Sequence, residues 1–112
     1  MIEFILYYGS TYNLRTNENY LNFRWLLKNT LILFSITQQG NGAICHLYSD
    51  KKSLRYLKQA LSEWCKFVFE NYNWCKMIIA IIEKPSIERL TKYCGFKKVF
   101  TINNKLIYIK EN

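Results

Sequence analysis

The sequence predicts one mixed α/β domain, in which three helices flank a largely antiparallel sheet. Large apolar residues recur at three- and four-residue steps over residues 51–72, which is typical of a long amphipathic helix. Residues 77–82 form an unbroken apolar run, as in a central strand covered on both faces. Two glycines near residue 41 and two asparagines at residues 103–104 indicate two hairpins. In chain order the predicted elements are β-α-β-β-α-β-α-β-β, and residues 1–112 form a single unit.

The N-terminal part of the chain is predicted to contain a strand and a helix. Residues 2–8 are apolar and aromatic apart from one glutamate, a composition that favours a strand. Over residues 17–27, Tyr20, Phe23 and Leu27 follow the spacing of one helix face. This spacing predicts a short amphipathic helix.

The middle of the chain is predicted to form a hairpin and then the long helix. Residues 31–37 and 43–49 are strand-like, and they flank a connection whose two glycines permit positive φ. The helix over residues 51–72 contains neither proline nor glycine. Either Ser49 or Asp50 can cap its first turn.

The C-terminal part is predicted to contain a strand, a helix and a second hairpin. The strand at residues 77–82 is followed by a helix over residues 85–94, which starts at a proline and ends at Gly95 in a left-handed stop. Residues 99–101 and 105–109 then close the chain as a hairpin across an Asn-Asn turn.

The excess of positive charge lies entirely in the second half of the chain. The net charge is +8, and residues 51–112 hold 13 Lys and Arg against 5 Asp and Glu, whereas residues 1–50 are balanced. This asymmetry indicates an acidic partner. Coenzyme A phosphates, a nucleic acid and an acidic protein surface all fit the description.

Other features narrow the class of protein. The longest apolar runs are far shorter than the ~18 residues of a membrane-spanning helix, and the N-terminus lacks a signal-peptide pattern, so we expect a cytoplasmic protein. The cysteines form no Cys-x-x-Cys pair, and the chain has only one histidine. This pattern favours buried thiols in a reducing compartment over a metal site.

A short segment in the second half carries a family resemblance. It reads Leu90-Thr91-Lys92-Tyr93-Cys94-Gly95-Phe96 and lies between a buried strand and the terminal hairpin. This arrangement, over residues 43–109, resembles the GNAT superfamily of acyl-CoA-dependent N-acetyltransferases, in which a helix of the form Asn-x-x-Ala-x-x-Leu-Tyr-x-x-x-Gly-Phe lies along the cofactor. Leu90, Gly95 and Phe96 fit that form, whereas its Asn, Ala and Tyr are replaced by Lys84, Ile87 and Thr91.

Two further segments are similar to one branch of that superfamily. Ser49-Asp50 at the entry of the long helix and Ser86-Ile87-Glu88-Arg89-Leu90 resemble the small GNAT-like internal-virion-type proteins of short-tailed phages. This resemblance implies a bacteriophage accessory or virion protein, present in the host cytoplasm or in the virion.

The family resemblance implies an acetyl-CoA site at the start of the long helix, where the family binds pyrophosphate on the amides of a Gln/Arg-x-x-Gly-x-Gly loop. Here no glycine occurs between Gly42 and Gly95, and Asp50 would repel a phosphate. Lysine side chains of the first turns can substitute as point charges, or they can form a solvated basic face. The candidate cofactor-binding residues are Ser49, Lys51, Lys52, Ser53, Arg55, Lys84 and Ser86.

Four residues are candidates for catalysis. Thr91 replaces the tyrosine that reprotonates the departing thiolate in the family, and its hydroxyl is a poorer acid than a phenol with a pKa of about 10. Tyr93 is close in sequence but lies on another side of the helix. His46 and Glu83 can relay the proton of an acceptor amine, although His46 can equally be a packed strand residue. Cys94 has no sequence-local base to make it a nucleophile.

The sequence leaves three functions open. The favoured one is a GNAT-like accessory protein with a degenerate acetyl-CoA site, which binds nucleic acid or a protein through its basic half. The alternatives are an active acetyl-CoA-dependent N-acetyltransferase and an inhibitor of a host factor. An open slot between residues 43–49 and 77–82 would favour the cofactor, because a closed slot leaves no room for pantetheine.

Overall fold

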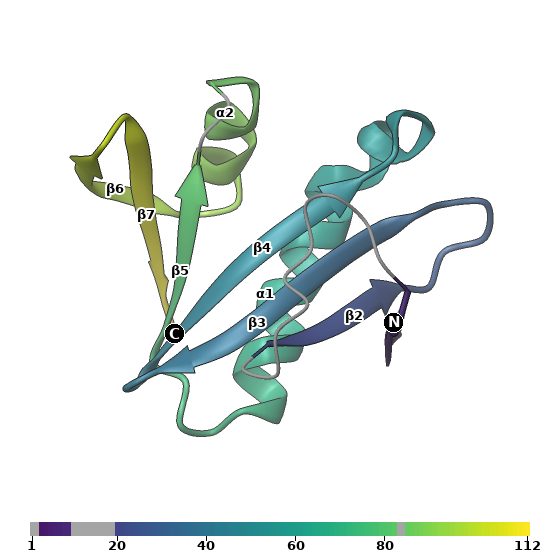
Figure 1. Ribbon diagram of the computed structural model, residues 1–112, viewed down its shortest axis with the longest axis horizontal. Coiled ribbons are helices and arrows are strands. Elements are labelled where there is room, and N and C mark those ends of the chain that lie inside the picture. The colour runs from purple at the N-terminus through teal and green to yellow at the C-terminus, as the bar shows by residue number, and fades with distance from the viewer. Residues whose placement is uncertain (1–2, 10–19, 83–84) are drawn as a thin grey trace.

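The computed structural model of the protein describes residues 3–9, 20–82 and 85–112, which form one seven-stranded sheet with helices on one face (Figure 1). The strands are β1 (Phe4–Leu6), β2 (Leu21–Trp25), β3 (Ile32–Gln39), β4 (Gly42–Ser49), β5 (Met77–Ile82), β6 (Lys97–Ile102) and β7 (Lys105–Glu111). The helices are the 3-10 helix η1 (Lys51–Tyr56) and the α-helices α1 (Leu57–Asn71) and α2 (Pro85–Tyr93). The sheet order is β1-β2-β3-β4-β5-β7-β6, and only β4 and β5 pair in parallel. The predicted fold class is confirmed, with one α-helix fewer.

The missing helix is replaced by a strand. We predicted a helix over residues 17–27, but residues 21–25 form β2, and residues 10–19 lie outside the described part of the chain. Phe23 and Trp25 are both buried, so Phe23 of the predicted helix face also satisfies a two-residue period with Trp25. Pairing with β1 on one side and β3 on the other outweighs the local helical spacing.

Both predicted hairpins are present, with longer strands than the sequence indicated. β3 and β4 are joined at Gly40, whose φ is 61°. β6 and β7 are joined at Asn103 and Asn104, whose φ values of 49° and 66° are those of a turn with two left-handed residues. Asparagine tolerates this region better than most side chains, which explains why the turn falls there.

The predicted long helix begins with a 3-10 segment. The Ser53 amide donates to both the carboxylate and the carbonyl oxygen of Asp50, at 3.0 and 3.2 Å, and the amide of Leu57 donates to Leu54 O. These three-residue spacings define the tighter helix. From Leu57 onward the apolar stripe of α1 packs on the sheet as the periodicity predicts.

The end of α2 follows the predicted left-handed stop. Gly95 has a φ of 93°, its amide donates to Lys92 O, and the amide of Phe96 donates to Thr91 O. The ammonium group of Lys110 on β7 also donates to the carbonyl oxygen of Cys94, at 2.7 Å. These bonds satisfy the last carbonyl groups of the helix and tie α2 to the sheet.

The core lies between the sheet and α1. The ring of Trp64, fully buried on α1, stacks on Phe34 of β3 with ring centroids 4.7 Å apart. On β5 only Ile78 and Ile82 are buried, and the intervening residues are half-buried. β5 is therefore central in the sheet, as predicted, but it is not covered on both faces. Below, the helical face is the face that carries α1 and α2, and the open face is the opposite one.

Candidate functional site: a slot between β4 and β5

A slot forms where the two parallel strands separate. β4 and β5 pair from Gly42 and Met77 to Cys45 and Ala80, and beyond this point each strand continues without the other. Figure 1 shows the two strands diverging from a common end as the arms of a V. A cavity of about 520 Å³ occupies this divergence. The open slot that the sequence left undecided is therefore present.

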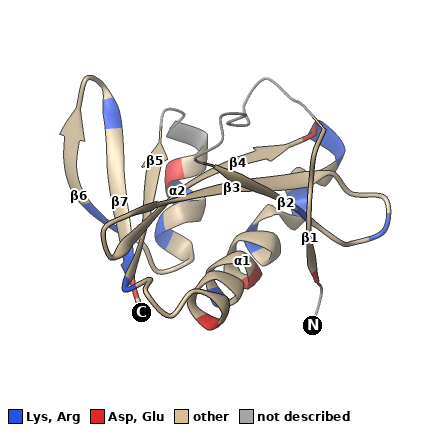
Figure 2. Cartoon of the chain, turned by 60° about the horizontal axis from the view of Figure 1, so that its bottom comes forward, with Lys and Arg blue, Asp and Glu red and all other residues tan. Residues whose placement is uncertain are grey.

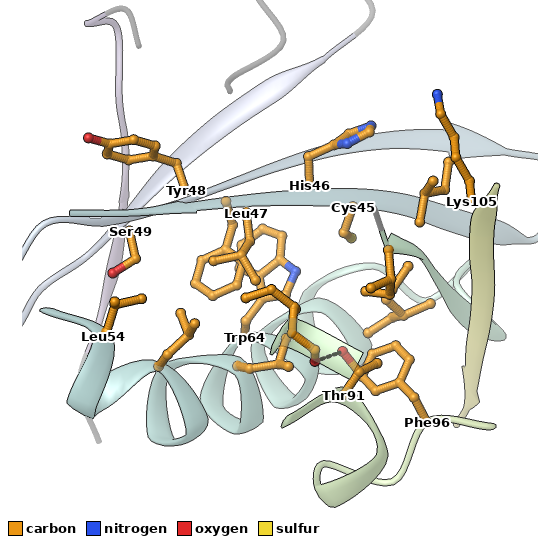
Figure 3. Close-up of a pocket in the computed structure, with 18 residues that line it drawn as sticks. Cys45, His46, Leu47, Tyr48, Ser49, Leu54, Trp64, Thr91, Phe96 and Lys105 are labelled. Carbon is orange, nitrogen blue, oxygen red and sulfur yellow. Dashed lines mark hydrogen bonds between the residues drawn. The ribbon is translucent and has the colours of Figure 1, made fainter. Parts of the chain in front are cut away.

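The slot passes through the sheet. Cys45, Leu47 and Ser49 of β4 point toward the helices, whereas His46 and Tyr48 point to the open face (Figure 3). Most other lining residues are apolar and come from β5, the helices and the turn after α2: Leu54, Leu57, Leu61, Ile78, Ala80, Ile81, Ile82, Ile87 and Phe96. The slot therefore suits an apolar or amide-bearing chain, and of its polar side chains His46, Tyr48 and Lys105 lie on the open-face side.

The entry to η1 lies beside the slot and differs from a phosphate cradle. The carboxylate of Asp50 caps this helix by accepting a hydrogen bond from the Ser53 amide. The buried Ser53 hydroxyl in turn accepts a hydrogen bond from the Leu31 amide, at 2.8 Å. The hydroxyl and the amide of Ser53 thus both have partners within the fold, and its role as a cofactor ligand stays a prediction.

The other predicted cofactor residues divide into three groups. Ser49 lines the slot, and its hydroxyl donates to Asp50 O. Lys51 and Lys52 are exposed in the first turn of η1. Arg55 is also exposed, but it donates to the hydroxyl of Tyr56 and lies over its ring. Lys84 lies outside the described residues, and the description of Ser86 extends only to its backbone, in the first turn of α2.

The candidate catalytic residues are only partly brought together. Thr91 is buried against the slot, and its hydroxyl donates to Ile87 O at 2.8 Å (Figure 3). His46 lines the same slot from the open face, and the ring of Tyr20 packs on it with centroids 5.8 Å apart. Tyr93 is 71% exposed and packs under the ammonium group of Lys58, outside the slot lining. Glu83 lies outside the described residues.

The cysteines do not provide a nucleophile. Cys45 lines the slot, and burial raises the pKa of its thiol well above the usual range. Cys94 lies between α1 and α2, with its sulfur 3.6 Å from the hydroxyl of Ser62. All four cysteines are free, and the described residues contain no group of His, Cys, Asp or Glu that could hold a metal ion.

Sequence reasoning missed two residues at the open-face mouth, Tyr48 and Lys105. Tyr48 is two positions after His46 on β4, and this spacing alone places the two on one face. Lys105 follows the Asn-Asn turn, and its place at the slot depends on the pairing of β7 with β5. No local signal in the sequence indicates that pairing.

Several solved structures share this fold. The N-acetyltransferase PseH of Campylobacter jejuni, solved also in complex with acetyl coenzyme A, has a TM-score of 0.74 and 12% identity over 86% of this chain and 70% of its own. The GNAT domain of S. lividans PAT has a TM-score of 0.70 and 7% identity over 84% and 61%. The dodecameric spermidine N-acetyltransferase of Vibrio cholerae has a TM-score of 0.67 and 14% identity over 85% and 66%.

The chain therefore has the fold of the GNAT N-acetyltransferases. The sequence itself matches no protein-family profile and no curated protein. Within the described residues, no helix combines the length and the apolar character needed to cross a membrane.

Proposed function

We propose that the chain binds an acyl-coenzyme A thioester in the slot between β4 and β5 and transfers its acyl group to an amine. The observation that carries this proposal is the separation of the two strands beyond Cys45 and Ala80, with a cavity of about 520 Å³ between them. The solved complex of PseH with acetyl coenzyme A, a protein of the same fold, supports it.

The slot fits the pantetheine arm. A strand directs its N–H and C=O groups alternately toward its two neighbours, so β4 beyond Cys45 presents such groups to the slot instead of to β5. The two amides of a pantetheine arm can pair with them as another strand would. Leu47, Leu57 and Ile87 supply apolar walls for the rest of the arm.

The diphosphate of coenzyme A cannot be bound here by a loop of free backbone amides, so it requires other ligands. The Asp50 carboxylate already accepts the Ser53 amide, and a second anion at this helix start would be repelled. Lys51 and Lys52 are exposed in the same turn, and their ammonium groups can neutralise phosphates without needing backbone approach. We therefore assign the phosphates to these two lysines.

The chain's own polar groups define the acceptor side. When bound, the thioester supplies an activated acyl carbonyl, which an amine converts to an amide as the thiol leaves. His46 is positioned at the open-face mouth to accept a proton from an incoming amine. Thr91 keeps its hydroxyl proton on Ile87 O, so the departing sulfur would take its proton from solvent. We expect slow turnover as a consequence.

Calorimetric titration with acetyl-CoA tests the binding step. Lys51→Glu with Lys52→Glu should weaken binding at least about tenfold. Lys66→Glu with Lys76→Glu, at two other exposed lysines, changes the net charge equally and should leave binding nearly unchanged. Absence of acetyl-CoA binding to the unaltered protein, or an equal loss in both variants, would contradict the proposal.

Acyl transfer is tested separately, by the release of free thiol from acetyl-CoA in the presence of a panel of primary amines. His46→Ala should reduce the release while acetyl-CoA binding stays the same. Leu54→Trp, at a half-exposed position of the slot lining, should instead weaken acetyl-CoA binding by narrowing the slot. Thiol release that is unaffected by His46→Ala would remove this residue from the reaction.

A second function is supported by the Asp50 cap and the committed Thr91 hydroxyl, both of which depart from an efficient cofactor site. In this alternative the protein is a phage-type accessory or virion-associated protein with a degenerate acetyl-CoA site, which acts through its basic half on a nucleic acid, a protein or a host factor. It predicts no thiol release with any amine and a salt-dependent gel shift on DNA, or capture of a host factor from host lysate.

A further inference from the structure

β6 is an edge strand of the sheet, and its outer side is exposed. β6 is the last strand in the sheet order, and within the described chain no strand pairs with its outer side. Every residue from Lys97 to Ile102 is exposed. Because a strand turns half of its N–H and C=O groups to each side, this edge offers a ladder that an added strand can complete.

The exposed edge is apolar toward its turn and basic at its start. Val99, Phe100 and Ile102 are 48%, 49% and 50% exposed. Lys97 and Lys98 precede them, and an irregularity in the pairing lies between Lys98 and Phe100. Lysines and bulges protect edge strands from unspecific pairing, but here they guard only the first half of β6. The segment from Phe100 to Ile102 stays regular in its pairing with β7.

The charge around this edge is mainly positive. Residues 89–110 contain six Lys and Arg and no Asp or Glu. Figure 2 shows a similar separation in space: the described acidic residues lie on the helices, between β4 and η1 and near the ends of the chain, and apart from Glu111 at the end of β7 the charged residues of the β6–β7 hairpin are basic. This positive charge therefore favours a negatively charged binding partner at the edge.

We propose that β6 is a docking edge for an extended acidic segment of a partner protein, which adds to the sheet as an eighth strand. Backbone pairing satisfies the edge, apolar side chains of the segment cover Phe100 and Ile102, and carboxylates pair with Lys97 and Lys98. A second copy of this chain fits less well, because it brings another basic hairpin to the same seam. A nucleic acid fits less well, because its phosphates cannot complete a backbone ladder.

Selection from a displayed library of random peptides tests the proposal. Peptides selected on the intact protein should combine β-branched residues with Asp or Glu. Synthesised with a fluorescent label, they should bind at least about tenfold more weakly to the Lys97→Glu, Lys98→Glu variant and to the Phe100→Ser, Ile102→Ser variant. The Lys66→Glu, Lys76→Glu variant should bind as the unaltered protein does. All substituted residues are exposed, and circular dichroism verifies that each variant is folded.

Four results would overturn the proposal: no selected peptides, peptides insensitive to the β6 variants, self-association that the β6 variants abolish, or an oligonucleotide that binds to β6 in place of peptides. Titration of the same variants with acetyl-CoA separates this site from the slot. Cofactor binding should be unchanged by Lys97→Glu with Lys98→Glu, so either site can fail without the other.

Discussion

The two parts of the sheet on either side of the slot are built differently. In β3, Ser35 on the open face is as fully buried as Phe34 on the helical face. In β6 every residue is exposed on both faces, and β5 is only half-buried on the open face. One wall of the slot, β4, therefore pairs with a strand that is buried on both faces, and the other wall, β5, pairs with the thin β6–β7 hairpin. The sheet is more deeply buried in the first part than in the second.

This division separates the roles of the two parts. A wall that holds a ligand in register must be rigid, and the aromatic packing of Trp64 against Phe34 provides this for β4. β7 supplies the buried Tyr108 to the core, whereas β6 has no buried residue, so the surface of β6 is available for charge and for binding a partner. Substitutions in the two parts should therefore have opposite consequences for stability and for association.

The largest effect is expected from the core of the first part. Trp64→Ala removes a fully buried indole and should reduce the free energy of unfolding by about 3–5 kcal/mol. Phe100→Ala on β6, where the ring is half-exposed, should cost less than about 1 kcal/mol. Urea unfolding measures both. Equal losses would show that the hairpin is as strongly packed as the core.

The next effect tests how the second part is attached to α2. Lys110→Met removes the charged hydrogen bond to Cys94 O and should reduce the free energy of unfolding by about 1–2 kcal/mol. Lys98→Met, at an exposed lysine of the neighbouring strand, is the control and should be nearly neutral. If the two substitutions have the same effect in thermal unfolding, the bond to the helix end does not hold α2.

A smaller effect is expected at the start of η1. Asp50→Ala removes the helix cap and should reduce the free energy of unfolding by about 1 kcal/mol. The same change removes a carboxylate from the expected phosphate position, so acetyl-CoA should bind more tightly. Asp50→Asn keeps a capping oxygen and should improve binding with little loss of stability. Weaker binding in both variants would place the phosphates elsewhere.

A last effect is confined to alkaline pH. Burial raises the pKa of Tyr108 from 10.0 to about 12, and the hydrogen bond that its hydroxyl donates to Glu88 acts in the same direction. The neutral phenol is thus favoured by folding, so its contribution is complete below pH 10 and is lost as the pH rises toward 12. Tyr108→Phe should flatten this part of the stability profile. An identical profile in both proteins would contradict the raised pKa.

Local signals explain what could be predicted from the sequence. The stripe of α1, the stop at Gly95 and the turn at Asn103 and Asn104 each depend on a few neighbouring residues, and the structure confirms all three. β2 was mistaken for a helix because Tyr20, Phe23 and Leu27 follow one helix face, whereas Phe23 and Trp25 fit a strand, and the choice is made by pairing with β1 and β3. That information is not local.

The candidate site was predicted only in part for the same reason. His46, Ser49 and Thr91 line the slot, because strand and helix order places them there, and their catalytic and binding roles stay predictions. The commitment of the Thr91 and Ser53 hydroxyls to backbone groups of Ile87 and Leu31 depends on side-chain geometry. The sequence alone does not show it.

The closed end of the slot is fastened by backbone hydrogen bonds. The Lys76 amide donates to Asn41 O at 2.7 Å, and the Asn112 amide donates to Lys76 O at 3.0 Å, so three distant parts of the chain meet where the V begins. Because β4 and β5 share no ladder beyond Cys45 and Ala80, widening the slot breaks no strand pairing between them. Beyond this clasp, the distance between the two arms is therefore set by the packing of α1 against α2, where the Cys94 sulfur contacts Ser62 and Lys58, and not by strand pairing.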